Sequence, residues 1–126
     1  MLENVELNST TYRRKVDALL TAGAANMGSS KYTTALGHLD AALRLAHVYA
    51  DKVVEALACC NLSSLYYQVR DDEKGAFYPM KAESLMVRYG ENWDTKTQCT
   101  IMISMAVAER KVKFNCFVLV NNSILE

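Results

Sequence analysis

The fold is decided by residues 32–49, which read YTTALGHLDAALRLAHVY. Apolar side chains recur in this stretch at the spacing i, i+3, i+4 and i+7, at Tyr32, Ala35, Leu36, Leu39, Ala42, Leu43, Ala46 and Tyr49. This spacing places them on one face of an α-helix for more than four turns. The stretch therefore predicts an amphipathic helix that must be covered by neighbouring elements.

Helical patterns flank this stretch on both sides. The cluster Asn8-Ser9-Thr10-Thr11 is typical of a helix start, and Gly28-Ser29-Ser30 interrupts the helix that follows. Downstream, Asp51 opens a third helix, a charged break at 70–75 precedes a fourth, and Gly90 is expected to end the fourth. The remaining expected helices cover about 12–27, 52–69, the residues up to 88 or 89, and 96–111.

Two of these helices are apolar on more than one face. The helices at 52–69 and 96–111 carry apolar residues nearly all round, so each is expected to lie between neighbours. The tail, 113–126, is apolar and rich in residues that favour strands. A strand-like end, a helical cap and a loose end all remain open for it.

The helical segments repeat at about 40 residues. This offset pairs Leu19 with Cys59 and Cys99. Such a period is typical of stacked helical hairpins, because one hairpin cannot bury its own apolar faces. The predicted fold class is therefore all-α, with antiparallel helical hairpins stacked as a short solenoid of about five helices. An ordinary antiparallel helical bundle is the alternative.

Composition limits the class of function. The 126 residues contain 14 Lys+Arg and 14 Asp+Glu, and this zero net charge argues against a nucleic-acid partner. No apolar run approaches the roughly 20 residues that a membrane-spanning helix needs, and the N-terminus does not resemble a secretory signal. We therefore expect a cytoplasmic protein without a membrane partner, in which the cysteines are buried small hydrophobic residues.

Nothing in the sequence predicts catalysis. His38 and His47 are nine residues apart on one helix, so they point in opposite directions and cannot share a metal ion. The acidic run at 71–73 lacks the spacing of a calcium loop, and phosphate-binding, dinucleotide and hydrolase motifs are absent from the sequence. We expect no enzymatic activity, no cofactor and no metal.

The helical hairpins resemble the tetratricopeptide repeat. The pattern is carried by Gly23, where the two helices touch, by Tyr32 at the start of the second helix, and by Ala35, Leu39 and Ala42 on its packing face. Residues 61–67 resemble the longer repeats of kinesin light chains. The resemblance covers 12–112, leaving 1–11 as a lead-in and 113–126 as an apolar tail.

The second unit departs from this pattern. Gly75 stands where the family has Ala, and Pro79 stands where it has a bulky apolar residue. Proline inside a helix costs about 3 kcal/mol but almost nothing in the first turn. The helix is therefore expected either to kink or to begin late, near Tyr78.

The resemblance implies a non-enzymatic protein-interaction module, an adaptor or scaffold, that binds a peptide or partner helix in a concave groove. Asn61 would hydrogen-bond the backbone of the ligand and Tyr67 would offer an aromatic contact. An alternative for these positions is a structural role, with Leu57 and Cys60 in the core. The implied groove residues are Asp17, Leu20, Ala24, Met27, Leu57, Cys60, Asn61, Ser64, Tyr67, Gln68 and Thr97, with Thr100 as a further candidate.

A second hypothesis comes from the C-terminal region. The fifth helix has no partner helix after it, and the tail contains the apolar run Phe117-Val118-Leu119-Val120. An exposed apolar stretch predicts self-association or a partner surface. The chain would then be a structural subunit, or a fragment, of a larger helical assembly.

Overall fold

The computed structural model describes residues 8–125, and it describes side chains for residues 8–111. Every regular element in this range is helical, which confirms the all-α prediction. The elements are α2 (Ser9–Gly28), α3 (Tyr32–Val48), α4 (Lys52–Gln68), α5 (Asp72–Tyr89), the 3-10 turn η1 (Gly90–Asn92) and α6 (Thr95–Leu125).

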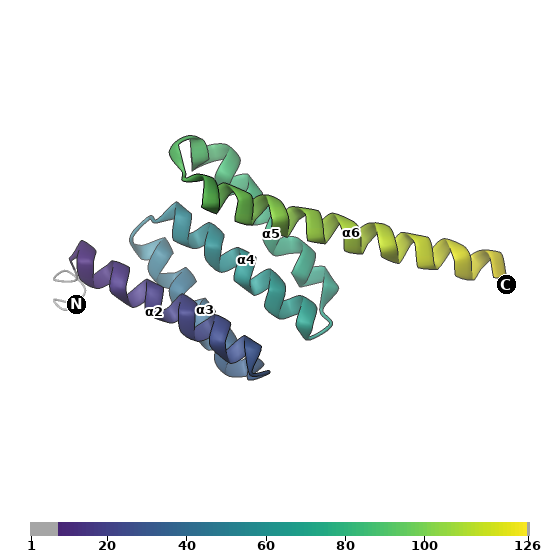
Figure 1. Ribbon diagram of the computed structural model, residues 1–126, viewed down its shortest axis with the longest axis horizontal. Coiled ribbons are helices and arrows are strands. Elements are labelled where there is room, and N and C mark those ends of the chain that lie inside the picture. The colour runs from purple at the N-terminus through teal and green to yellow at the C-terminus, as the bar shows by residue number, and fades with distance from the viewer. Residues whose placement is uncertain (1–7, 126) are drawn as a thin grey trace.

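The helices form two layers. In the view of Figure 1, α2, α4 and α6 lie in front of α3 and α5. Each helix packs against the next one along the chain, and α4 also packs against α2 and α6. Helix α4 is therefore surrounded on several sides, which confirms the prediction from its apolar circumference and explains why more than half of its residues are buried.

Three turns of identical geometry join α2 to α5. The middle residue of each turn, Ser30, Ala50 or Arg70, has a positive φ of 61°, 52° or 68°. The amide of the residue that follows donates to the carbonyl five residues back, at 2.8 Å in all three turns. This is the hydrogen-bond pattern of a Schellman motif, which normally uses glycine at the positive-φ position. These turns are spaced 20 residues apart, half of the repeat seen in the sequence.

Short polar side chains cap the helix starts. Asn8 accepts a hydrogen bond from the amide of Thr11 at 2.8 Å, so α2 begins at Ser9, before the expected start at Tyr12. Asp51 caps α4 through the amide of Val54 and also accepts from the Tyr12 hydroxyl at 2.8 Å. Burial, followed by this hydrogen bond, raises the pKa of Tyr12. Asp51 thereby ties the start of α4 to the start of α2.

The core runs through the molecule as three clusters shared between neighbouring helices. In the middle cluster, Leu39 of α3 and Leu62 of α4 are fully buried, and Met27 closes it from the end of α2. In the C-terminal cluster, Cys59 of α4 packs with Ala82 of α5 and Ile101 of α6. No hairpin has a core of its own, because each cluster takes side chains from at least three helices.

Within the first hairpin, α2 and α3 meet at Gly23. A Cβ atom there would lie 2.6 Å from Cδ2 of Leu39, closer than carbon atoms approach in proteins. Leu39 is fully buried, so other side chains pack around it and oppose its displacement. The small residue expected at this contact is therefore required by the distance between the two helices.

Within the second hairpin, the equivalent contact uses different residues. Helix α5 begins at Asp72 and contains the buried Pro79, so the late start near Tyr78 is wrong. Proline has no N–H to donate to the carbonyl of Gly75, four residues back. The Ser63 hydroxyl of α4 donates to that carbonyl instead, at 2.6 Å in a buried position. The hydrogen bond that the proline removes is thus replaced from the neighbouring helix.

The third unit is shifted relative to the 40-residue repeat. The turn η1 adds three residues, so α6 begins 43 residues after α4. The expected pairing of Cys99 with Cys59 is therefore wrong: Cys59 is buried and Cys99 is exposed. At the offset of 43, the buried residues Ala58 and Leu65 of α4 match the buried Ile101 and Ala108 of α6.

Helix α6 continues past residue 112 and extends beyond the ends of the other helices (Figure 1). Of the three conformations that the sequence left open for the tail, its backbone adopts the helical one as far as Leu125. The side chains of the tail lie outside the described residues.

We expect Ser63→Ala to lower the free energy of unfolding by about 1–3 kcal/mol, because it leaves the buried Gly75 carbonyl without a donor. In a Pro79→Ala background the new amide at position 79 can donate to that carbonyl. The effect of Ser63→Ala should then fall to about 1 kcal/mol or less. Urea unfolding followed by circular dichroism measures both values; equal losses in the two backgrounds would contradict the replacement of one donor by the other.

We expect Gly23→Ala to destabilise the fold by about 1–3 kcal/mol, because the added methyl group overlaps Leu39. This loss outweighs the helix propensity of alanine, which is worth about 1 kcal/mol. Gly37→Ala is the matched control, since a Cβ there meets nothing within 4 Å, and it should stabilise the protein by about 0.5–1 kcal/mol. Thermal unfolding of the two variants should shift in opposite directions.

Candidate functional site

A cleft of about 190 Å³ lies between α4 and α6. It lies where α6 packs against α4. Helix α4 contributes Cys60, Asn61, Ser63, Ser64 and Tyr67, and α6 contributes Thr100, Ile103, Ser104 and Val107. The cleft thus combines short polar side chains with apolar ones.

The polar groups on the α4 side are suited to hydrogen bonding. Asn61 is half-buried, and its amide makes no side-chain hydrogen bond within the part of the chain that is described. Ser64 is exposed, and its hydroxyl lies 3.5 Å from the carbonyl of Cys60, at the limit of a hydrogen bond. Burial raises the pKa of the Cys60 thiol, a shift that its hydrogen bond with Ser104 of α6 partly opposes. An amide that can both donate and accept is therefore the main polar group of the cleft.

The α6 side of the cleft is largely apolar. Ile103 is 64% exposed although it borders the cleft, and Val107 continues the same face one turn later. Such a surface can bury a side chain of a bound segment while Asn61 contacts its backbone.

Tyr67 is the last residue along α4 that lines the cleft. Its ring lies against the backbone of Gly75, where an added Cβ would be 2.6 Å away, and Nζ of Lys111 lies 4.9 Å from the ring centre. The hydroxyl is buried without a hydrogen-bond partner among the described residues. Burial, followed by the charge of Asp72, raises the pKa of Tyr67, so this hydroxyl stays protonated and can act as a donor.

The structure brings together only part of the predicted groove. Cys60, Asn61, Ser64 and Tyr67 line the cleft with Thr100. Leu57 is half-buried one turn before it, and Gln68 is exposed beyond it. Four of the six α4 residues of the prediction thus lie in one cleft, and Leu57 and Gln68 do not line it.

The predicted residues of α2 do not join them. Leu20 and Met27 pack in the core cluster around Leu39. Ala24 is exposed. Asp17 lines a separate shallow hollow with Arg13 and Arg14.

Thr97 lies at the start of α6 rather than in the cleft. Its hydroxyl donates to Oδ1 of Asp94 at 2.6 Å, and its amide donates to Oδ2 at 3.3 Å. These bonds hold the pKa of Asp94 below its ordinary value, with the hydroxyl contact as the larger cause. Thr97 is therefore buried as part of a helix cap.

The shift in repeat length explains why Thr97 was predicted wrongly as a cleft residue. It also explains why the α6 residues that do line the cleft were not predicted. At the 40-residue offset Leu57 matches Thr97, whereas at the observed offset of 43 it matches Thr100, which lines the cleft. The same offset matches the α4 residues 60, 61 and 64 to Ile103, Ser104 and Val107. Equivalent positions of two successive units thus line the two sides of the cleft. The α6 positions could have been predicted if the three extra residues at Gly90–Asn92 had been added to the repeat length.

Glu55 is a buried acid that the sequence did not single out. Its carboxylate lies 3.1 Å from Nε2 of His47 and 3.6 Å from Nζ of Lys52. The pair joins α3 to α4 at the turn between them. Within the described residues no three metal-ligating side chains gather, so this contact is a link between helices.

Curated proteins similar to this chain include two that share one name. The 43 kDa receptor-associated protein of the synapse from Gallus gallus is 41% identical over 93 residues, which are 74% of this chain and 23% of that protein. The protein of the same name from Tetronarce californica is 39% identical over the same length and shares. This chain therefore spans about a quarter of the length of these relatives. No protein-family model and no solved structure matches it.

The relatives correct the expected location. Their name associates them with a receptor and with the synapse, so the expectation of a simply cytoplasmic protein is wrong. None of the helices in the described range is long and apolar enough to cross a membrane. The relatives are named for association with a receptor, and their name states no enzymatic activity.

Proposed function

We propose that this chain is a non-enzymatic protein-interaction module that holds an extended peptide segment of a partner protein in the α4–α6 cleft. The observation that carries the proposal is the amide of Asn61, which lines that cleft and makes no side-chain hydrogen bond to any of the described residues. An extended peptide exposes alternating backbone donors and acceptors, and a primary amide can pair with one of each.

The size of the cleft supports a peptide rather than a small-molecule ligand. Its volume of about 190 Å³ is below the roughly 300–1,000 Å³ of typical small-molecule pockets. A peptide can place one side chain against Ile103 and Val107 while the rest of the segment lies along the surface.

The helical repeat is proposed to be of the tetratricopeptide type. Support comes from the contact of Gly23 with Leu39, from the 40-residue spacing of α3 and α5, and from the three identical turns. In that arrangement the first helix of each hairpin faces the ligand, and the proposed cleft uses two of these helices, α4 and α6.

The relatives suggest the setting in which the module acts. Because two similar proteins are named as receptor-associated proteins of the synapse, we propose that this chain likewise serves as an adaptor or scaffold in a receptor-linked assembly. Its partner would then be another protein of that assembly.

The test uses random 16-residue peptides displayed on phage and selected on the whole chain. The best peptide is then measured by fluorescence anisotropy. Asn61→Ala should weaken binding about tenfold, the effect of losing a hydrogen-bonded amide worth about 1.4 kcal/mol. Asn61→Asp keeps an acceptor but loses the donor, so it should also weaken binding.

Thr34→Ala, at an exposed position of α3 in the opposite layer, is the matched control and should leave the affinity unchanged. Circular dichroism confirms that each variant is folded. Selected peptides that bind the wild type and Asn61→Ala equally well would refute the cleft as the binding site.

A further inference from the structure

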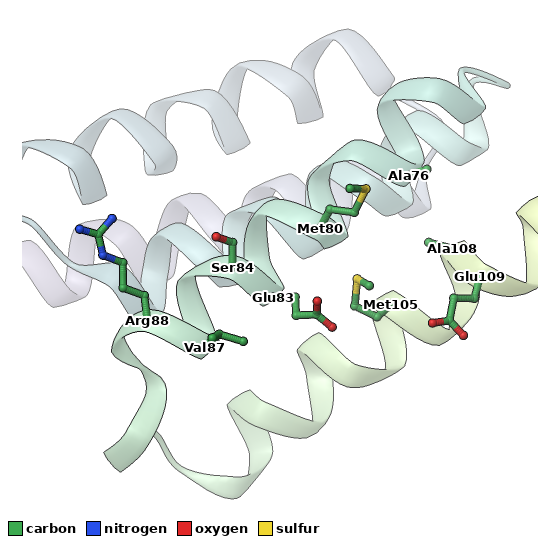
Figure 2. Close-up of a pocket in the computed structure, with 9 residues that line it drawn as sticks. All are labelled: Ala76, Met80, Glu83, Ser84, Val87, Arg88, Met105, Ala108 and Glu109. Atoms are coloured by element: carbon green, nitrogen blue, oxygen red, sulfur yellow. The ribbon is translucent and has the colours of Figure 1, made fainter.

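A second and larger groove, of about 720 Å³, lies between α5 and α6 (Figure 2). Its apolar lining comes from both helices: Ala76, Met80 and Val87 of α5, and Met105 and Ala108 of α6. Met80 is 62% exposed and Val87 is 81% exposed. Large apolar side chains that gather in one exposed groove mark an interaction surface.

We propose that this groove binds an amphipathic α-helix of a partner protein, which lies parallel to α5 with its N-terminal end beside Glu109. The surface is separate from the α4–α6 cleft, with which it shares no lining residue. It is therefore independent of the peptide-binding function proposed above.

The dimensions of the groove fit a helix. Its lining on α5 extends from Ala76 to Arg88, a rise of about 18 Å or just over three helical turns. Within the described residues, α5 packs against α4 on one side and against α6 on another. The groove lies along the surface between α5 and α6 that no described helix covers. A further helix could pack against both α5 and α6 here, as α4 packs against both α2 and α3. Met80 and Met105 can adjust their shape to an incoming apolar stripe.

The charges of the groove set the direction of the helix. Two acids, Glu83 and Glu109, line its middle and one end, and Arg88 lines the other end (Figure 2). A helix carries partial positive charge at its N-terminus and partial negative charge at its C-terminus. The N-terminus is therefore favoured beside Glu109 and the C-terminus beside Arg88. Basic residues in the first two turns of the partner helix would pair with the two acids.

The same charges argue against a second copy of this chain as the occupant. In a two-fold symmetric contact the same surface faces itself. Among the described lining residues there are two acids and one base, and a two-fold contact would place Glu83, in the middle of the groove, beside its own copy. A partner with a basic face is complementary to this surface.

The test compares two 16-residue peptides of identical composition, each held helical by a hydrocarbon staple on its polar face, since short helices are marginal in water. Both carry a Leu/Ala stripe. The first has two Lys in its first two turns and a Glu in its last turn, and the second has this order reversed. Fluorescence anisotropy with the whole chain should show that the first peptide binds about tenfold more tightly, because its charges and its helix dipole both match the groove.

Three variants locate the site. Val87→Asp should weaken the binding of both peptides about tenfold or more. The triple exchange Glu83→Lys, Glu109→Lys and Arg88→Glu should reverse the preference between them. Asn61→Ala, in the other cleft, is the matched control and should change neither affinity, so failure here is distinguishable from failure of the peptide-binding proposal.

Three results would overturn the inference. The first is no binding of either peptide at concentrations up to about 100 μM. The others are equal affinities of the two peptides and an unchanged affinity of the Val87→Asp variant. Sedimentation velocity supplies a further one. A dimer of this chain that Val87→Asp abolishes would assign the groove to a second copy instead.

Discussion

The rest of the structure depends on the short distance between the two helices of each hairpin. In the first hairpin Gly23 of α2 faces Leu39 and leaves no room for even a methyl group. Forty residues later, Ser63 takes the position of Gly23 and Pro79 takes the position of Leu39. The glycine of the second hairpin is Gly75, which lies on its second helix, α5. The Ser63 hydroxyl then also supplies the hydrogen bond that Pro79 cannot make. The same close contact is thus reached twice with different residues, which explains why the second unit departs from the pattern of the first without losing its helix.

Helix α4 links this packing to the proposed function. One side of it holds α5 through Ser63, and the neighbouring side presents Asn61 and Ser64 to α6. Because Ser63 and Ser64 are adjacent in the sequence, the register that closes the hairpin also orients the cleft. The position of α6 is set independently by η1, so the two walls of the cleft have separate structural origins.

Much of the fold could be predicted because it rests on periodicity. The amphipathic pattern of residues 32–49 located α3, and the apolar circumference of 52–69 indicated a helix between neighbours. The pattern could not reveal the hydrogen bond from Ser63 to the Gly75 carbonyl. The sequence shows that Pro79 lacks an N–H, but it does not show whether another residue donates to that carbonyl instead. The α4 residues of the cleft were largely predicted, whereas most of its α6 residues were not, and the cause is the length of the third unit. Three additional residues at Gly90–Asn92 shift the third unit, and a fixed repeat length then selects Thr97, a capping residue, in place of Thr100.

The three matching turns at Ser30, Ala50 and Arg70 restrict how the length of this chain can change. Each turn fixes the rotation of the helix that follows it, and one inserted residue would rotate that helix by about 100° and carry its buried face toward solvent. Insertions and deletions are therefore disfavoured in the first three connections. The connection through η1 already accommodates a longer path between α5 and α6 without disturbing the buried match of Ala58 with Ile101. Length variation among related chains should accordingly concentrate there, where it would change the spacing of the cleft and of the α5–α6 groove while the first two hairpins stay the same.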